Sequence, residues 1–220
     1  MRLTTLLPFV LAALAALPLP AAAQASAPLA VSDGALVVDA LGHRLALPMP
    51  DWVVAPVADT AQLTEQISST YFADDLQASI ELFPRGESEA FWTTLYGIRL
   101  NQGEDMSLVQ LRQAVVNVYA RACQPQSVAL FQFEADNGDD IPPLGFVCGA
   151  YLNEIPAYAG RGEIMVIGFY RTPTGVGMVY QEWRGAAFDP EDPATWPVGS
   201  EVIEARMAQL RSDVRVSAAD

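Results

Sequence analysis

The chain has 220 residues, of which 26 are acidic and 12 are basic, and its formal net charge is −14. A negative field of this size repels the phosphates of nucleic acids and anionic membrane surfaces, so neither is expected as a partner. Hydrophobic residues make up 51% of the chain, which is enough to bury the core of one domain of this length.

The first 23 residues have the order of a secretory signal peptide. Arg2 gives a short positive start, residues 6–19 form an apolar stretch too short to span a bilayer, and Ala21–Ala23 precede a cleavage point. We place cleavage after Ala23, with Ala25 as the alternative; a retained membrane anchor is the other interpretation. No later stretch is long and apolar enough for a transmembrane helix. The mature chain is therefore expected to be periplasmic or secreted.

Residues 24–34 are expected to be a flexible N-terminus, and residues 35–216 a single α+β domain. Alternating apolar and polar positions on either side of short turns predict three β-hairpins. The hairpins pair 35–39 with 44–47, 67–72 with 76–83, and 163–171 with 176–184, and two further strands cover 127–133 and 144–152.

Helices are predicted at 60–66, 88–98 and 107–122, followed by a last helix capped by Ser200. Phe91, Leu95 and Ile98 form one stripe at helical spacing, and Ser107 with Gln110 matches a capping box. The residues expected to be buried on the last two helices are Leu108, Leu111, Val115, Val118, Ala122, Ile203, Met207 and Leu210.

The segment 164–169 indicates how the layers are arranged. Its residues are apolar at both alternating sets of positions, which is typical of a strand covered on both sides. The fold class that we expect is α+β, with an antiparallel β-sheet built from hairpins and helices packed on both faces as a sandwich.

This order of elements resembles the PsbP/Mog1-type α/β/α sandwich. The resemblance consists of an early hairpin, the strand exit Leu47-Pro48…Asp51-Trp52, mid-chain helices, a late β-meander and a C-terminal helix, over about residues 35 to 215. It implies an accessory or assembly factor more than an enzyme. It contains no signature motif, so no functional residue is transferred from it.

The two cysteines, Cys123 and Cys148, are expected to form a disulfide bond, since an isolated pair in an exported chain usually does. The alternative is a redox-active pair, but a separation of 25 residues lacks the Cys-x-x-Cys arrangement that tunes thiol acidity.

Two weak candidate sites follow from local clusters. The acidic segment 134–140 offers Asp136, Asn137, Asp139 and Asp140 to a hard cation such as calcium, although a solvated turn is the simpler interpretation. On the last predicted hairpin, Tyr180, Trp183 and Arg184 could line a ligand groove, although they could equally be ordinary packing residues.

Catalytic motifs are missing from the sequence. His43 is the only histidine and is expected to be a solvated turn residue, and no nucleophile elbow accompanies it. One histidine and a paired set of cysteines do not supply a zinc site. We therefore expect no catalytic residue, no metal and no cofactor.

The sequence thus predicts an exported, non-catalytic envelope protein that serves as an accessory or binding module for a partner protein or a small ligand. The alternative is a hydrolase-like enzyme with an unrecognised carboxylate and arginine site.

Overall fold

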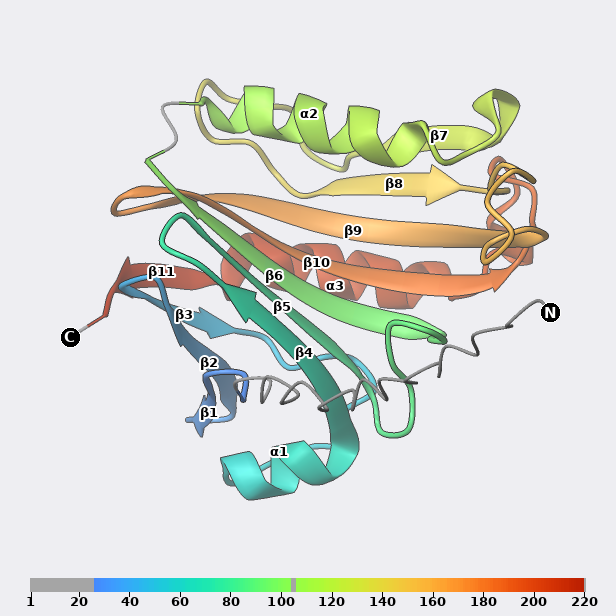
Figure 1. Ribbon diagram of the computed structural model, residues 1–220. Helices are drawn as coiled ribbons and strands as arrows, with labels where there is room; N and C mark the ends of the chain where they lie inside the picture. The colour runs from blue at the N-terminus through green and yellow to red at the C-terminus, as the bar shows by residue number, and fades with distance from the viewer. Residues whose placement is uncertain (1–25, 104–105, 220) are drawn as a thin grey trace, which may run out of the picture.

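The computed structural model describes residues 26–103 and 106–219, which form two antiparallel β-sheets and three α-helices (Figure 1). The predicted signal peptide, 1–23, lies outside the described residues. In the large sheet the strand order is β4-β5-β6-β10-β9-β8-β7, and in the small sheet it is β1-β2-β3-β11.

The large sheet consists of β4 (Ile67–Ala73), β5 (Gln77–Pro84), β6 (Thr94–Gln102), β7 (Val128–Phe131), β8 (Leu144–Cys148), β9 (Arg161–Thr172) and β10 (Gly175–Ala186). The small sheet consists of β1 (Leu29–Ser32), β2 (Ala35–Ala40), β3 (His43–Leu47) and β11 (Arg215–Ala218). The helices are α1 (Thr60–Gln66), α2 (Leu108–Ala120) and α3 (Ser200–Ser212), with short 3₁₀ turns at Pro125–Ser127 and Pro193–Thr195.

The long hairpin of β9 and β10 is the centre of the fold. Successive side chains of a strand point to opposite faces, and here they join two separate hydrophobic clusters. Val166 and Val179 belong to the cluster that contains Ile203, Met207 and Leu210 of α3. Met165 and Met178 belong to the cluster that contains Leu108 of α2. The expected α+β class therefore agrees with the structure, although sheet dominates and the small sheet adds a layer that the sequence analysis missed.

The predicted disulfide bond between Cys123 and Cys148 is confirmed, and the two Cα atoms are 5.7 Å apart. Cys123 follows the end of α2, and Cys148 is the last residue of β8. The bond therefore fastens α2 to the sheet at the end of the helix.

Helix α2 begins as predicted, with the capping box of Ser107 and Gln110 present in both directions. Leu108 is buried, but Val118 is 64% exposed and does not belong to a buried stripe. Leu111, Val115 and Tyr119 also pack against the cluster below α2, while the surface around Val118 stays open.

The helix predicted at 88–98 is wrong, because this region contains strand β6. Tyr96, Ile98 and Leu100 alternate into one cluster, while Leu95 belongs to the cluster on the opposite face. A strand that is buried on both faces also carries apolar residues three and four positions apart, and this spacing imitates a helical stripe.

The N-terminal segment also differs from the expectation of a flexible 24–34. Leu29–Ser32 is strand β1, which pairs with β2 across a turn at Asp33 and Gly34. Both turn residues have positive φ, 52° and 75°, as the tightest hairpin turns require. Strand β11 was not predicted either, and the cap of α3 is Gly199 in place of Ser200.

His43 is buried and not solvated, because it begins β3 beneath the turn of the β9–β10 hairpin. Its Nε2 lies 2.9 Å from the Thr174 hydroxyl, and burial lowers its pKa. Neither His43 nor its contact with Thr174 forms a catalytic set. Among the described residues, no helix is both long and apolar enough to cross a membrane.

Candidate functional site

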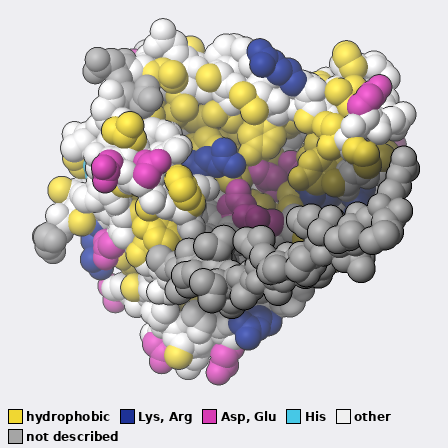
Figure 2. Space-filling model, in the orientation of Figure 1, with side chains coloured by type: hydrophobic (Ala, Val, Ile, Leu, Met, Phe, Trp, Pro, Cys, Tyr) yellow, Lys and Arg dark blue, Asp and Glu magenta, His cyan; other side chains and the backbone are white. Residues whose placement is uncertain are grey.

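A cavity of about 430 Å³ opens on the face of the large sheet that carries α2. We call it the acidic cavity, because Glu81, Glu89, Glu163 and Glu182 line it together with Arg184. Trp92, Tyr119, Tyr151 and Tyr158 supply aromatic walls. Figure 2 shows acidic side chains at the floor of a hollow that hydrophobic side chains surround.

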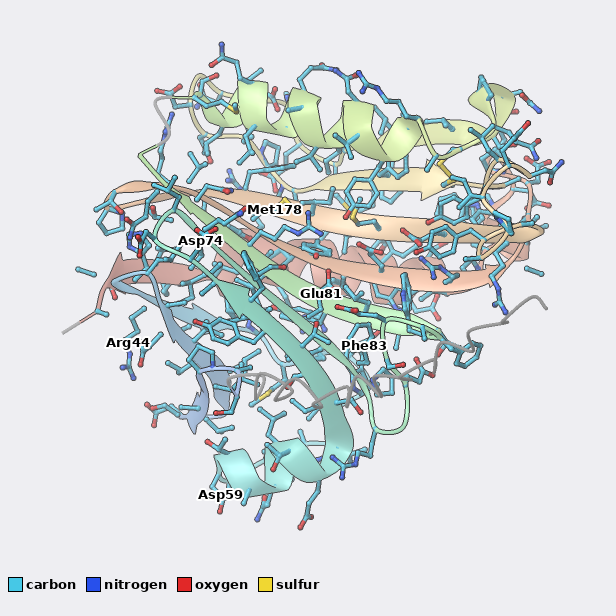
Figure 3. The ribbon with its side chains drawn as sticks, viewed as in Figure 1. Arg44, Asp59, Asp74, Glu81, Phe83 and Met178 are labelled. Atoms are coloured by element: carbon cyan, nitrogen blue, oxygen red, sulfur yellow. A yellow bond between two sulfur atoms is a disulfide. The ribbon has the colours of Figure 1, made fainter. Side chains whose placement is uncertain are left out.

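Strand alternation brings these side chains to one face. Tyr180, Glu182 and Arg184 are two residues apart on β10, so they point the same way. Hairpin register places Glu163 of β9 directly opposite Arg184. On β5, Glu81 is two residues from Phe83. Phe83 and Met178 both belong to the hydrophobic cluster that contains Leu108 of α2, which we call the α2 cluster, and Figure 3 labels all three residues.

A glycine makes room for the ring of Tyr180 on the same face of the sheet as the cavity. Gly97 of β6 is the register partner of Tyr180, and a Cβ at Gly97 would lie only 2.0 Å from the tyrosine ring. The ring therefore lies across β6, where its hydroxyl donates a hydrogen bond of 3.3 Å to Glu81 on β5. A larger residue at 97 would displace this ring.

Glu163 and Arg184 form a buried ion pair at one end of the cavity. The Nη2 and Nε atoms of Arg184 lie 2.8 and 3.1 Å from Glu163 Oε2, which also accepts from the Tyr151 hydroxyl. The Arg184 guanidinium stacks 3.5 Å above the ring of Trp92 and 4.4 Å from the ring of Tyr158. Arg184 is therefore fully occupied by protein groups.

Glu182 has no such partner. It is only 4% exposed; the Tyr119 hydroxyl donates to it at 3.4 Å, and the Glu163 carboxyl lies within hydrogen-bonding reach. Among the described residues, no arginine lies within ion-pair distance of it. Burial raises the pKa of Glu182 well above its usual range, and the neighbouring Glu163 carboxyl raises it further. Both effects favour the neutral form of Glu182, which faces the cavity.

The tyrosine hydroxyls around Glu182 are neutral donors. Burial raises the pKa values of Tyr119 and Tyr151, and the nearby Glu182 and Glu163 respectively raise them further. At the outer side, Arg99 lies 3.6 Å from Glu81 and is 45% exposed. The cavity thus contains the buried ion pair of Glu163 with Arg184 and the longer, partly exposed pair of Glu81 with Arg99. Two further acidic groups, Glu182 and Glu89, have no basic partner within the part of the chain that the structure describes.

The predicted groove of Tyr180, Trp183 and Arg184 is partly supported. Arg184 lines the acidic cavity and Tyr180 lies on the same face. Trp183 points to the other face, where it belongs to the α3 cluster and its Nε1 donates a 2.8 Å hydrogen bond to Asp51. Trp183 therefore takes no part in this site, because it lies between Glu182 and Arg184 on the strand and points to the opposite face.

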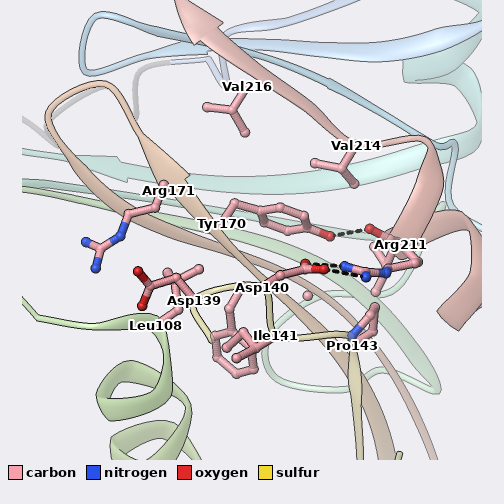
Figure 4. A pocket seen from close by; sticks show the side chains of 13 residues that line it. Leu108, Asp139, Asp140, Ile141, Pro143, Tyr170, Arg171, Arg211, Val214 and Val216 are labelled. Atoms are coloured by element: carbon pink, nitrogen blue, oxygen red, sulfur yellow. Dashed lines mark hydrogen bonds and ion pairs between the residues drawn. The ribbon is translucent and has the colours of Figure 1, made fainter. Parts of the chain in front are cut away.

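In the acidic segment 134–140, arginine side chains hold two of the four residues predicted to bind a cation. Arg112 Nη1 lies 2.9 Å from Asp136 Oδ1. Arg211 Nη2 lies 2.7 Å from Asp140 Oδ2, a pair that Figure 4 shows. Asn137 and Asp140 pair only through their backbones. Across residues 26–103 and 106–219, no group of three or more His, Cys, Asp or Glu side chains could hold a metal ion. Two of the expected ligands are neutralised by arginine.

Comparison with known proteins identifies no relative: no family model, curated protein or solved structure matches this chain. The resemblance to the PsbP/Mog1-type sandwich stays a prediction.

Proposed function

We propose that this chain is a non-catalytic binding protein of the bacterial envelope, exported by its N-terminal leader, and that the acidic cavity holds a small ligand. The observation that carries the proposal is Glu182, a buried carboxyl that faces a cavity and lacks a basic partner. A buried acid whose surroundings raise its pKa, and which has no basic side chain beside it, is a common feature of functional sites.

The cavity has the features of a small-molecule site. Its volume lies in the range of ligand pockets, and aromatic walls surround a few convergent polar groups. Its floor is part of the central β-sheet, and the disulfide bond fastens the end of α2 beside it. Such a rigid frame lowers the entropic cost of ordering a site when a ligand binds.

The cellular location and the layer arrangement belong to the same proposal. A disulfide bond suits an oxidising compartment, in agreement with the predicted leader. We infer a sandwich in which α2 covers one face of the large sheet and α3 with the small sheet covers the other. This is the arrangement that the resemblance to PsbP/Mog1-type accessory proteins implies.

The experiment is a thermal-shift screen of the protein purified from the periplasm against small amines, sugars, amino acids and carboxylates. A ligand at about 100 times its Kd adds about 2.7 kcal/mol of stability, which raises the Tm of a chain of this size by roughly 5–10 °C. Mass spectrometry of the purified chain tests the cleavage site after Ala23.

Two tryptophan variants on one helix make this test specific. Val118→Trp places a large ring at the mouth of the cavity, since Val118 is exposed and lines it. Val109→Trp makes the same change at another exposed position, which lies on the opposite side of α2. We expect Val118→Trp to abolish the ligand-induced shift and Val109→Trp to keep it. Equal shifts in the two variants would place binding elsewhere and defeat the proposal.

A second candidate, an acid–base hydrolase, rests on the neighbouring carboxyls of Glu163 and Glu182. A pair whose surroundings separate the two acidities is a common arrangement for a general acid and its ionised partner. Against it, Glu163 Oε2 already accepts three hydrogen bonds. Hydrolysis of aryl glycosides that falls about a hundredfold or more in Glu182→Gln would favour the enzyme; no turnover by the wild-type protein favours the binding protein.

A further inference from the structure

We propose that the acidic cavity takes a small organic ammonium ion, with the Glu182 carboxylate as its counter-ion. This inference rests on the proposed function and specifies the chemical class of its ligand.

The balance of charge around the cavity favours a cation. Four glutamates line it against the single arginine, Arg184, which Glu163 holds. Arg99 lies outside the lining and is turned toward Glu81. An anionic ligand would meet the uncompensated Glu182 and Glu89, whereas a cation would supply the charge that the site lacks.

The geometry favours an organic cation over a metal ion. No three acidic, histidine or cysteine side chains converge on one point among the described residues. The end of the cavity at Glu182 instead offers separate acceptors: the Glu182 carboxyl, the Tyr119 hydroxyl beside it at 3.4 Å, and the nearby Glu81, whose charge acts on Glu182. An ammonium group carries three N–H donors and suits such a spread of acceptors.

The aromatic walls suit the same class of ligand, since a cation is attracted to ring faces. Arg184 already uses the faces of Trp92 and Tyr158 in this way, at 3.5 and 4.4 Å. The ligand's ammonium group is therefore expected beside the Glu182 carboxyl and the Tyr119 hydroxyl, and not on these two rings. Its organic part then extends past Val118 and Ala122 toward the opening.

Binding of a cation at this position is linked to a proton. The charged and titratable groups that face Glu182 are Glu163 on β9, Glu81 on β5, Arg184 and Tyr180 on β10, Tyr119 on α2, and Tyr151. Burial and the two glutamates favour the protonated form of Glu182 when the cavity holds no cation. An ammonium ion favours the carboxylate, so its binding releases one proton, and affinity rises by up to about tenfold for each pH unit.

Three probes of nearly one shape test the ligand class: benzylammonium, benzyl alcohol and benzoate. Isothermal titration calorimetry in two buffers of different ionisation enthalpy measures both affinity and proton release. We expect benzylammonium alone to bind, with a measurable release of protons on binding. We expect Glu182→Gln to weaken it about tenfold or more, and Glu65→Gln, an exposed position on α1 outside the cavity lining, to leave it unchanged.

The outcomes separate this inference from the proposed function. If benzyl alcohol or benzoate binds as tightly as benzylammonium and Val118→Trp blocks this binding, the preference for a cation is wrong. The proposal that the cavity binds a small ligand would then still hold. Unchanged benzylammonium affinity in a folded Glu182→Gln variant would overturn the role of the counter-ion. Failure of all three probes at millimolar concentration would overturn the ammonium class, while the wider ligand screen still decides the proposed function.

Discussion

Replacing Glu182 by glutamine should alter how the stability of the ligand-free protein depends on pH. In the unfolded chain the carboxyl titrates near its ordinary pKa of 4.5, but in the folded protein burial and Glu163 raise that pKa well above this value. Above pH 4.5 the unfolded state therefore holds fewer protons than the folded state. Stability falls as pH rises, by about 1.4 kcal/mol for each pH unit, until Glu182 ionises in the fold as well. Glutamine keeps the shape and has no proton to lose.

The measurement is urea denaturation of the wild-type protein and of Glu182→Gln at several pH values between 5 and 8. The difference in free energy of unfolding should grow with pH in favour of the variant, which corresponds to roughly 2–4 °C in Tm for each kcal/mol. Other carboxyls titrate in both proteins and cancel. Glu89→Gln, at an exposed position, is the matched control and should run parallel to the wild type. Parallel curves for Glu182→Gln would refute the assignment of a protonated, buried acid.

Two further predictions concern the frame around the cavity. Reduction of the Cys123–Cys148 disulfide, whose cysteines are 25 residues apart, should lower the free energy of unfolding by about 3.5 kcal/mol. The double serine variant should show the same loss and no response to reductant. A wild-type free energy of unfolding that is unchanged after full reduction would argue against this role of the disulfide. Arg184→Ala leaves Glu163 buried without its ion pair and should cost about 3–5 kcal/mol in urea denaturation, whereas Arg99→Ala, at 45% exposure, should cost about 1 kcal/mol or less. Equal losses in the two arginine variants would contradict the difference in burial on which this comparison depends.

Local signals were sufficient for much of the fold. Alternating residues with short turns predicted the hairpins of β2–β3, β4–β5 and β9–β10, and the Ser107 capping box located the start of α2. The signal failed where burial removes the alternation. Strand β6 is covered on both faces, so its apolar residues fit a helical stripe and a strand equally well.

Part of the acidic cavity was also within reach of the sequence. A hairpin that turns at 172–175 places Glu163 opposite Arg184, as the structure does, and puts Glu182 on the same face. What the sequence could not provide is the approach of Tyr119 from α2 and Glu81 from β5, because these contacts depend on how distant segments pack. The sequence of the hairpin therefore predicts only the part of the cavity that β9 and β10 contribute.

The fold itself offers no reason for an acid at position 182. The register partners of Glu182 are Met165 on β9 and Leu95 on β6, both apolar and both packed in the α2 cluster. Glu163, by contrast, stands opposite Arg184 and satisfies it. A leucine or glutamine at 182 would suit these neighbours better than a carboxyl that loses stability as pH rises. A residue that breaks the local rule of its strand without a basic partner to balance its charge points to function, and here a bound cation would supply the missing charge.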